Sequence, residues 1–295
     1  MVDPTRMAPR TASKTVLFIS AYQNFMHEMF SFSIHEVFDG SEWSVNTRCA
    51  HSNLDWYKSF LIDCRKNPPA GMILVAVSPR FFTYQPDWLP QPCTKTVLMV
   101  HEIPGRTYDI VRSDAYAEGL ILGDFLATKG YRDVIYVTQA QPGEVPESKT
   151  LKGLAKRLSE KGIPFNQRNI RRYEDTHSYG PHPDPVTDAY QFTRKLLAAE
   201  RPRAIIAGHD WTGVGILRAV QEAGLAVPKD IAVLSAERTV DLNRWVAGPK
   251  LTTFDTMYYH RARTAAELLK ARLEGDDGPI RYHEIHGQLI EGETA

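Results

Sequence analysis

The sequence AIIAGHDWTGVGILRAVQEAGLAVPKDIAVL, residues 204–234, decides the fold of this chain. It opens with a short apolar run at 204–207 that predicts a buried strand, and 211–223 has the apolar spacing of a helix that ends at Gly224. A second apolar run follows at 231–234. Strands that are apolar throughout are typical of a parallel sheet covered on both faces by helices. The stretch therefore predicts a strand–helix–strand unit of a parallel α/β fold.

The same alternation of apolar runs and helical segments extends over almost the whole chain. Asp114 stands where a helix N-cap is expected, and Gly130 and Gly162 stand where helices should end. Two successive runs of strand–helix units predict two doubly wound parallel-sheet subdomains, and the last helix or strand follows the second run and is available to cross back to the first. The remaining expected strands are 15–20, 43–49, 71–77, 96–100, 133–138, 167–173, 251–254 and 281–290, and the remaining expected helices are 24–38, 53–66, 115–129, 147–161, 188–200 and 258–273.

Composition excludes several classes of protein. The 295 residues include 35 Lys and Arg against 35 Asp and Glu, so the chain lacks the basic surplus of a free-standing DNA reader. No apolar run approaches the roughly 18 residues of a membrane span. Residues 1–14 have the composition of a disordered leader or linker and lack the apolar segment of a signal peptide. Cys49, Cys64 and Cys93 are odd in number and form no CxxC, which favours reduced thiols in a cytoplasmic protein that does not act at a membrane.

Motifs for cofactors and nucleophiles are missing from the sequence. It contains no GxGxxG, GxxxxGK[ST] or GxSxG. Two histidine pairs, His177 with His182 and His283 with His286, fall short of the ligand set that a metal site needs. We therefore expect no cofactor, no metal site and no catalytic residue.

Ligand-binding side chains are expected in the loops after the strands, because doubly wound sheets bind their ligands there. Two facing subdomains would form an interdomain cleft, and its closure would convert binding into a change of shape. His209, Asp210 and Trp211 follow the strand expected at 204–207 and open a helix. Asp210 is either the N-cap of that helix or, together with His209, a hydrogen-bonding partner for a polar ligand that stacks on Trp211.

Two other strand ends leave alternatives open. Arg80 would either clamp a ligand or lie on the surface, and His101 with Glu102 would form either an acid–base pair or a turn. The sequence shows no nucleophile beside these residues or beside His209 and Asp210. An enzyme that uses either pair is therefore the weakest of the interpretations.

In their order along the chain, these passages resemble the effector-binding core of the LacI/GalR (lactose/galactose repressor) family, which shares its fold with periplasmic sugar-binding proteins and includes regulators of the xylose type. The most specific match is QEAGLAVPKDIAV at 221–233, which is similar to the family's G..vP.DisV segment. The other matching passages are VRSD at 111–114, TKGYRDV at 128–134, AIIAGHDWTGVG at 204–215, LTTF at 251–254, AAELL at 265–269 and HGQLIE at 286–291.

The resemblance implies an N-terminal subdomain of residues 15–131 plus 254–279 and a C-terminal subdomain of 132–253 plus 280–295, joined by three crossovers. It also implies that a small polar effector (a sugar, sugar acid or nucleoside-like molecule) binds in the cleft. The family's effector contacts carry over to Phe25, Met26, Arg80, Asp114, His209 and Asp210.

Two departures from the family alter the expected ligand clamp. Thr150 stands three residues before Gly153, where many relatives have an effector-binding arginine, and Ala236 precedes Glu237 where they often have an aspartate. The pair of side chains that usually holds sugar hydroxyls is therefore altered, unless Lys149 and Glu237, each one position away along the chain, make its contacts instead.

Regulators of this family have a helix-turn-helix before the core, and the fourteen residues ahead of the first strand are too few for one. We therefore expect the ligand-sensing and dimerisation region of a LacI-type transcriptional regulator, a homodimer that reaches operator DNA only through a reader absent from this chain. The alternative is a stand-alone binding protein of the periplasmic type, against which the missing signal peptide argues.

Overall fold

A computed structural model describes residues 14–20, 25–50, 53–75, 95–99, 108–140, 148–174, 176, 184, 186–239, 241 and 247–295, without the side chains of residues 25 and 54. The chain divides into two compact units. Unit 1 is Met1–Arg112 with Tyr258–Ile285, and unit 2 is Ser113–Met257 with His286–Ala295. The chain therefore passes between the units three times, as a fold with three crossovers requires.

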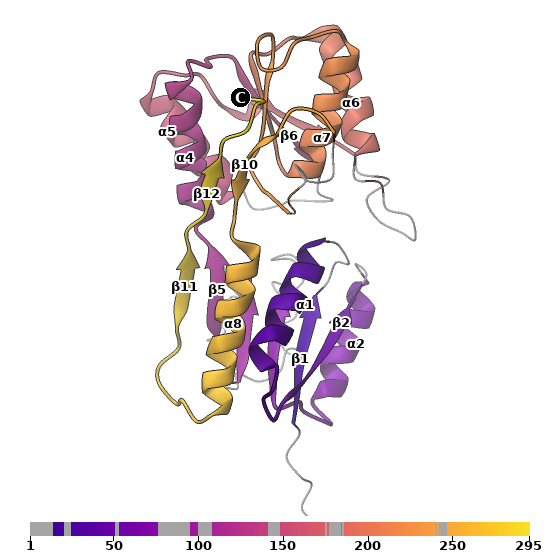
Figure 1. Cartoon of the computed structure of the whole chain (residues 1–295), viewed down its shortest axis with the longest axis vertical. Helices are drawn as coiled ribbons and strands as arrows, with labels where there is room; N and C mark the ends of the chain where they lie inside the picture. The colour runs from indigo at the N-terminus through magenta and orange to yellow at the C-terminus, as the bar shows by residue number, and fades with distance from the viewer. Residues whose placement is uncertain are drawn as a thin grey trace, which may run out of the picture. The chain divides into compact units, whose positions relative to one another are not determined.

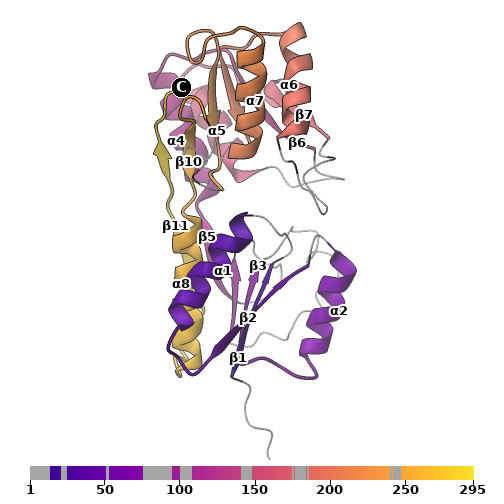
Figure 2. The same cartoon turned by 45° about the vertical axis from the view of Figure 1, so that its right-hand side comes forward.

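Unit 1 is built on a six-stranded sheet of order β11-β5-β4-β3-β1-β2, in which the pairs from β5 to β2 are parallel. Helices α1 and α8 lie on one face of this sheet and α2 lies on the other (Figures 1 and 2). The elements are β1 (Thr15–Ser20), α1 (Phe25–Phe38), β2 (Ser44–Cys49), α2 (Leu54–Cys64), β3 (Gly71–Val75), β4 (Thr96–Met99), β5 (Asp109–Ser113), α8 (Tyr258–Leu273) and β11 (Tyr282–Ile285).

Unit 2 repeats the plan with a six-stranded sheet of order β12-β10-β9-β8-β6-β7, parallel except that β10 and β12 are antiparallel. Helices α4 and α5 cover one face of this sheet, and α6 and α7 cover the other (Figure 1). The elements are α4 (Ala115–Thr128), β6 (Val134–Gln139), α5 (Lys149–Glu160), the 3₁₀ turn η2 (Gln167–Asn169), β7 (Ile170–Tyr173), α6 (Thr187–Ala199), β8 (Ala204–Ala207), α7 (Asp210–Glu222), β9 (Ala232–Ser235), β10 (Thr252–Asp255) and β12 (Gln288–Ile290).

The apolar strands serve two cores at once, which explains why they do not alternate with polar residues. In β1, Val16 and Phe18 pack under α1 and α8, whereas Leu17 and Ile19 pack under α2. All four side chains are at most 4% exposed. A strand buried on both faces needs an apolar residue at every position, so the apolar runs correctly predict the α/β class and its two sheets.

The structure sets the unit boundaries elsewhere than the expected ones. Helix α4 belongs to unit 2 rather than to the first subdomain, because it packs closely on α5. Strand β11 belongs to unit 1, since Arg281 O accepts a hydrogen bond from the Ile110 N–H of β5. The single strand expected at 281–290 is therefore two strands in different sheets, β11 and β12.

Two smaller differences concern β5 and β7. Strand β5 was not expected, because its sequence DIVRS has only two apolar residues and its Asp109 is charged. The strand expected at 167–173 begins only at Ile170, since Asn166 caps a 3₁₀ turn ahead of it. No described helix is both long and apolar enough to cross a membrane.

Candidate ligand-binding site

The carboxyl end of the unit 2 sheet is where a ligand site is expected, because open parallel sheets bind ligands beyond the ends of their strands. Strands β6, β8, β9 and β10 run parallel and end at this edge. The residues that follow β8 and β9, and the last residue of β10, lie at this edge. They form a connected set of hydrogen bonds around the first turn of α7.

His209 is the N-cap of α7, so the first of the two alternatives for Asp210, that it caps this helix, is wrong. The backbone of His209 is extended, with φ −148° and ψ 167°, and its Nδ1 accepts a hydrogen bond from the Thr212 N–H at 3.3 Å. Its Nε2 lies 3.1 Å from Thr212 Oγ1. A ring nitrogen that accepts from a backbone N–H has no proton, so the neutral ring has its hydrogen on Nε2. The ring therefore takes the place of the usual short polar cap.

Asp210 ties the loop after β9 to the start of α7. Its carboxylate accepts hydrogen bonds from the Thr239 N–H at 2.8 Å and from Thr239 Oγ1 at 2.6 Å, and its own N–H donates to Glu237 O at 2.9 Å. The residue is only 1% exposed. A buried carboxylate is stable only when such donors surround it, so Asp210 fixes the position of residues 237–239.

Burial of the His209 ring has an electrostatic consequence. Although part of the residue stays exposed, burial lowers the pKa of His209 from 6.5 to about 4. Thr212 Oγ1 is also 2.8 Å from the Tyr173 hydroxyl at the end of β7. The edge therefore presents a neutral imidazole in a line of hydrogen bonds from His209 through Thr212 to Tyr173.

We expect acidification from pH 7 to pH 4.5 to lower the free energy of unfolding of unit 2 by about 2–3 kcal/mol through His209. The folded pKa lies below the unfolded one, so this contribution is complete above pH 6.5 and is lost as the pH falls toward 4. Urea denaturation at both pH values measures it. His209→Asn keeps a capping oxygen without titrating. It should show a loss smaller by that amount, whereas an equal loss in both proteins would contradict the assignment.

Glu237 projects from a backbone that is fixed on every side. Ser235 Oγ donates to Glu237 O at 2.7 Å, and the Arg238 N–H donates to Phe254 O at 2.8 Å. Glu237 is partly buried, and its charge acts on Tyr136. Burial, followed by the charges of Glu237 and then Glu118, raises the pKa of Tyr136. Because this backbone is held, the Glu237 carboxylate can be offered to a ligand without the loop first being ordered.

Arg238 and Asp255 complete the edge. Arg238 Nη1 is 2.9 Å from Asp255 Oδ2, and Arg238 Nη2 is 3.1 Å from Asp241 Oδ1. Trp211 is the second residue of α7, and its ring is partly exposed. The edge thus combines a carboxylate, an aromatic ring and a neutral imidazole, the usual mixture of a site for a small polar molecule.

The other expected contacts lie on separate elements. Asp114 caps α4 by accepting from the Ala117 N–H at 3.1 Å, as its position in the sequence predicts, and lies 3.6 Å from His286 Nδ1. Lys149 is exposed on the first turn of α5. In unit 1, Met26 is partly buried against the core under α1 and α8.

Several expected residues cannot be placed. Arg80, His101 and Glu102 lie outside the described residues, as do His177, His182, Cys93 and residues 1–13, and Phe25 opens α1 without a described side chain. Among the described residues, no three His, Cys, Asp or Glu side chains gather as a metal ion would require.

Sequence reasoning placed residues 236–239 among the loops at strand ends but singled out only Glu237 there, and it did not name Tyr173 or Asp255 as members of the site. Asp255 directly follows the expected strand at 251–254, so the rule of strand ends could have found it as well. Tyr173 ends the expected strand at 167–173, but its partner Thr212 lies in a helix distant in sequence, so the sequence does not show their contact.

Comparison with known proteins adds three findings. Residues 124–295 match the family model of the periplasmic binding protein-like domain. The chain is 27% identical over 183 residues to the HTH-type transcriptional repressor PurR of Mannheimia succiniciproducens, a match covering 62% of this chain and 51% of the relative. It is 24% identical over 248 residues to PurR of Yersinia pestis, covering 82% and 68%. The chain thus spans about half the length of one relative and about two thirds of the other.

Solved structures show the same fold. The transcription regulator CcpA of Lactococcus lactis superposes with a TM-score of 0.78 at 14% identity, covering 97% of this chain and 100% of that one. A LacI family transcriptional regulator from Enterococcus faecium with bound ribose superposes with a TM-score of 0.75 at 18% identity, covering 95% and 98%. The described architecture is therefore the fold of these structures.

Proposed function

This chain belongs to the periplasmic binding protein-like family, in the form that makes the effector-binding core of LacI/GalR-type regulators, and we propose that it binds a small polar effector at the carboxyl end of the unit 2 sheet. The observation that carries this proposal is the hydrogen-bonded loop 237–239. Asp210 holds this loop, so Glu237 is presented beside the start of α7.

The residues at this edge favour a hydroxyl-bearing effector, such as a sugar or nucleoside. Glu237 offers an acceptor for hydroxyl donors, and Trp211 offers an apolar ring face for a sugar or base. Two carboxylates, Glu237 and Glu118, lie near the Tyr136 hydroxyl and disfavour an anionic group at that point. We propose Asp114, Lys149 and Met26, with Phe25 and Arg80, as further contacts.

The proposed activity is binding without catalysis. His209 is held by Thr212 and Asp210 by Thr239, so neither side chain is arranged as an acid or base toward a substrate. The relatives are named as transcriptional repressors. Effector binding would instead shift the population of two states of the chain, to an extent set by its affinity for each state.

We further propose a homodimer that regulates transcription in the cytoplasm. Closed twofold assemblies are the commonest oligomers, and a dimer would present two DNA readers with a fixed spacing. In this proposal, operator DNA is contacted by a helix-turn-helix of a longer protein. Sedimentation of the chain at the mass of one copy would contradict the dimer.

Isothermal titration calorimetry with D-ribose, D-xylose, D-gluconate and adenosine tests the effector site. We expect one of these classes to bind, and we expect Glu237→Gln to weaken that binding by about tenfold or more, since hydrogen bonds to a charged acceptor are the stronger ones. Glu160→Gln is the matched control because Glu160 lies at the far end of α5 and pairs with Lys156. Absence of heat from every probe, or equal weakening by both variants, would contradict the proposal.

A further inference from the structure

The chain leaves unit 2 for unit 1 through a residue with an unusual backbone. Met257 is the last residue of this part of unit 2, and α8 begins at the next position. Its φ is 59°, and no other described residue except glycine has a positive φ. Residues with side chains avoid this left-handed region because Cβ crowds the following carbonyl. The surrounding structure must therefore hold Met257 in place.

Asp255 supplies that support through both of its oxygens. Oδ1 accepts a hydrogen bond from the Met257 N–H at 2.8 Å, and Oδ2 accepts one from Arg238 Nη1 at 2.9 Å. The Asp255 and Arg238 side chains are only 21% and 22% exposed. A half-buried pair of this kind is stronger and better ordered than an ion pair on the surface.

Arg238 belongs to the same loop as Glu237. Its N–H donates to Phe254 O at 2.8 Å, next to Asp255, so the loop and the end of β10 are joined by backbone and side chain together. Asp210 fixes Thr239 on the other side of Arg238. One ion pair therefore connects the loop that presents Glu237 to the turn at Met257.

We infer that Arg238 is a positioning residue that couples the effector site to the passage at Met257. A ligand that draws on Glu237 would shift the adjoining Arg238 against Asp255. The Asp255 carboxylate would then either keep or lose its hydrogen bond from the Met257 N–H. This hydrogen bond would determine how freely the backbone turns where it enters unit 1. The inference rests on the proposed function for its effector, but the ion pair and the turn exist without one.

Hydrogen exchange of the Met257 amide, measured by NMR without ligand, tests the first half of the inference. Arg238→Met leaves Asp255 less fixed and should raise the exchange rate of this amide by about tenfold. Arg238→Lys restores one charged hydrogen bond and should recover part of the protection. Asp241→Asn removes the other ion pair of Arg238 and should leave Met257 unchanged. The amide of Ile205 in β8 reports on global stability and should not respond to any of them.

Asp255, the other member of the ion pair, provides a second variant. If Arg238 acts through Asp255, then adding Arg238→Met to Asp255→Asn should change Met257 exchange no further. An additive change would show that Arg238 acts through another group and would overturn the inference. So would an Arg238→Met protein in which Met257 and Ile205 exchange faster by the same factor, because the effect would then be general destabilisation.

Spin-label distance measurements test the coupling itself. Labels at Ser59→Cys in α2 and Ser159→Cys in α5 report on the two units, since both positions are exposed, with Cys49, Cys64 and Cys93 replaced by serine. Arg238→Met should broaden the distribution of distances between labels, and Asp241→Asn should not. Faster Met257 exchange with an unchanged distribution would overturn the coupling. Because no ligand is added, failure of the coupling remains distinct from failure of the effector site.

Discussion

Replacing Arg272 with alanine is expected to lower the free energy of unfolding of unit 1 by about 3–5 kcal/mol, the typical cost of breaking a buried ion pair from one side. The Arg272 and Asp109 side chains are each 1% exposed, and the guanidinium donates two hydrogen bonds to the carboxylate, at 2.8 and 2.9 Å. It also donates to the carbonyls of Asp276, Gly278 and Pro279. Removal of Arg272 would leave the Asp109 charge buried without its partner.

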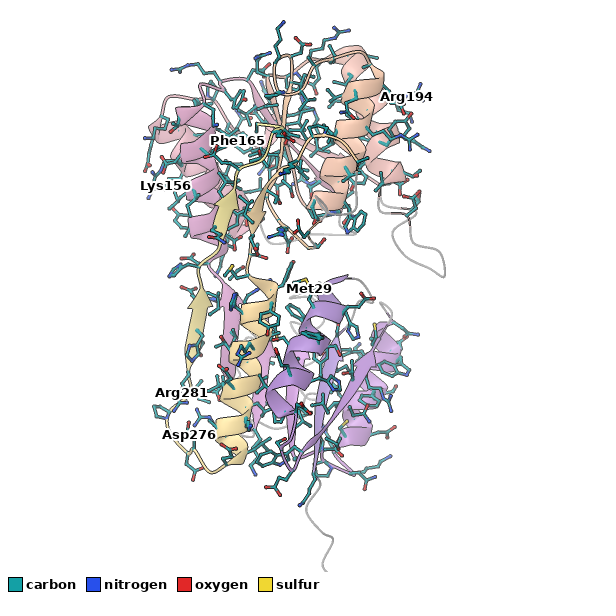
Figure 3. The ribbon with its side chains drawn as sticks, in the orientation of Figure 1. Met29, Lys156, Phe165, Arg194, Asp276 and Arg281 are labelled. Atoms are coloured by element: carbon teal, nitrogen blue, oxygen red, sulfur yellow. The ribbon has the colours of Figure 1, made fainter. Side chains whose placement is uncertain are left out.

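The consequence should extend to the connection between α8 and β11. Arg281 N–H donates to Asp109 Oδ1 at 2.8 Å, and Arg281 Nη2 lies 2.7 Å from Asp276 Oδ2 (Figure 3). Asp109 and Arg272 thus hold the loop that leads into β11. We therefore expect amides of β11 to exchange faster in Arg272→Ala, while those of the unit 2 sheet do not.

Hydrogen exchange over a urea series measures the loss unit by unit. Arg263→Ala is the matched control, because Arg263 lies on the same helix and pairs with Glu267 at the surface. It should change stability by no more than about 0.5 kcal/mol. The double variant Arg272→Met with Asp109→Leu should recover much of the loss, since an apolar pair can replace a buried ion pair. Equal effects of Arg272→Ala and Arg263→Ala would contradict this account.

Replacing Gly153 with alanine is expected to destabilise unit 2 by about 2–3 kcal/mol, the usual cost of overpacking a close contact. A Cβ at Gly153 would lie 2.1 Å from Tyr116 O in α4, and a Cβ at Gly119 would lie 2.0 Å from Thr150 O in α5. The helices cross where these glycines face backbone atoms, so neither clash can be relieved by rotating a side chain. The two helices would have to separate.

Chemical denaturation of Gly153→Ala against Ser159→Ala provides the comparison. Ser159 is exposed on the same helix, so its replacement adds helix propensity without a clash. We expect Ser159→Ala to be neutral or slightly stabilising. A Gly153→Ala protein as stable as Ser159→Ala would show that α4 and α5 do not approach as closely as described.

The fold was largely predictable because it depends on a local pattern. Apolar runs such as 204–207 and 231–234 are buried on both faces, so each position reports its environment, and α8 was predicted with the bounds Tyr258–Leu273. Strand β5 was missed because Asp109 is buried only by virtue of Arg272, which is distant in sequence. A buried charge whose partner is distant in sequence leaves no pattern in the residues around it.

The candidate site was predictable in location but not in detail. The rule of strand ends selected His209, Asp210 and Glu237, and the structure connects Asp210 to Glu237 directly. The rule did not identify His209 as the cap of α7. Aspartate is the more common capping residue, but in the structure the Asp210 carboxylate accepts hydrogen bonds from Thr239 instead. Such choices depend on which loop packs against the helix, which local sequence does not specify.

A crystal structure grown with whichever calorimetric probe binds would test the central claim most directly. We predict that the bound molecule places a hydroxyl within hydrogen-bond distance of the Glu237 carboxylate and a ring face against Trp211. Density for that molecule at another place, with Glu237 still held in loop 237–239 and facing only water, would contradict the account.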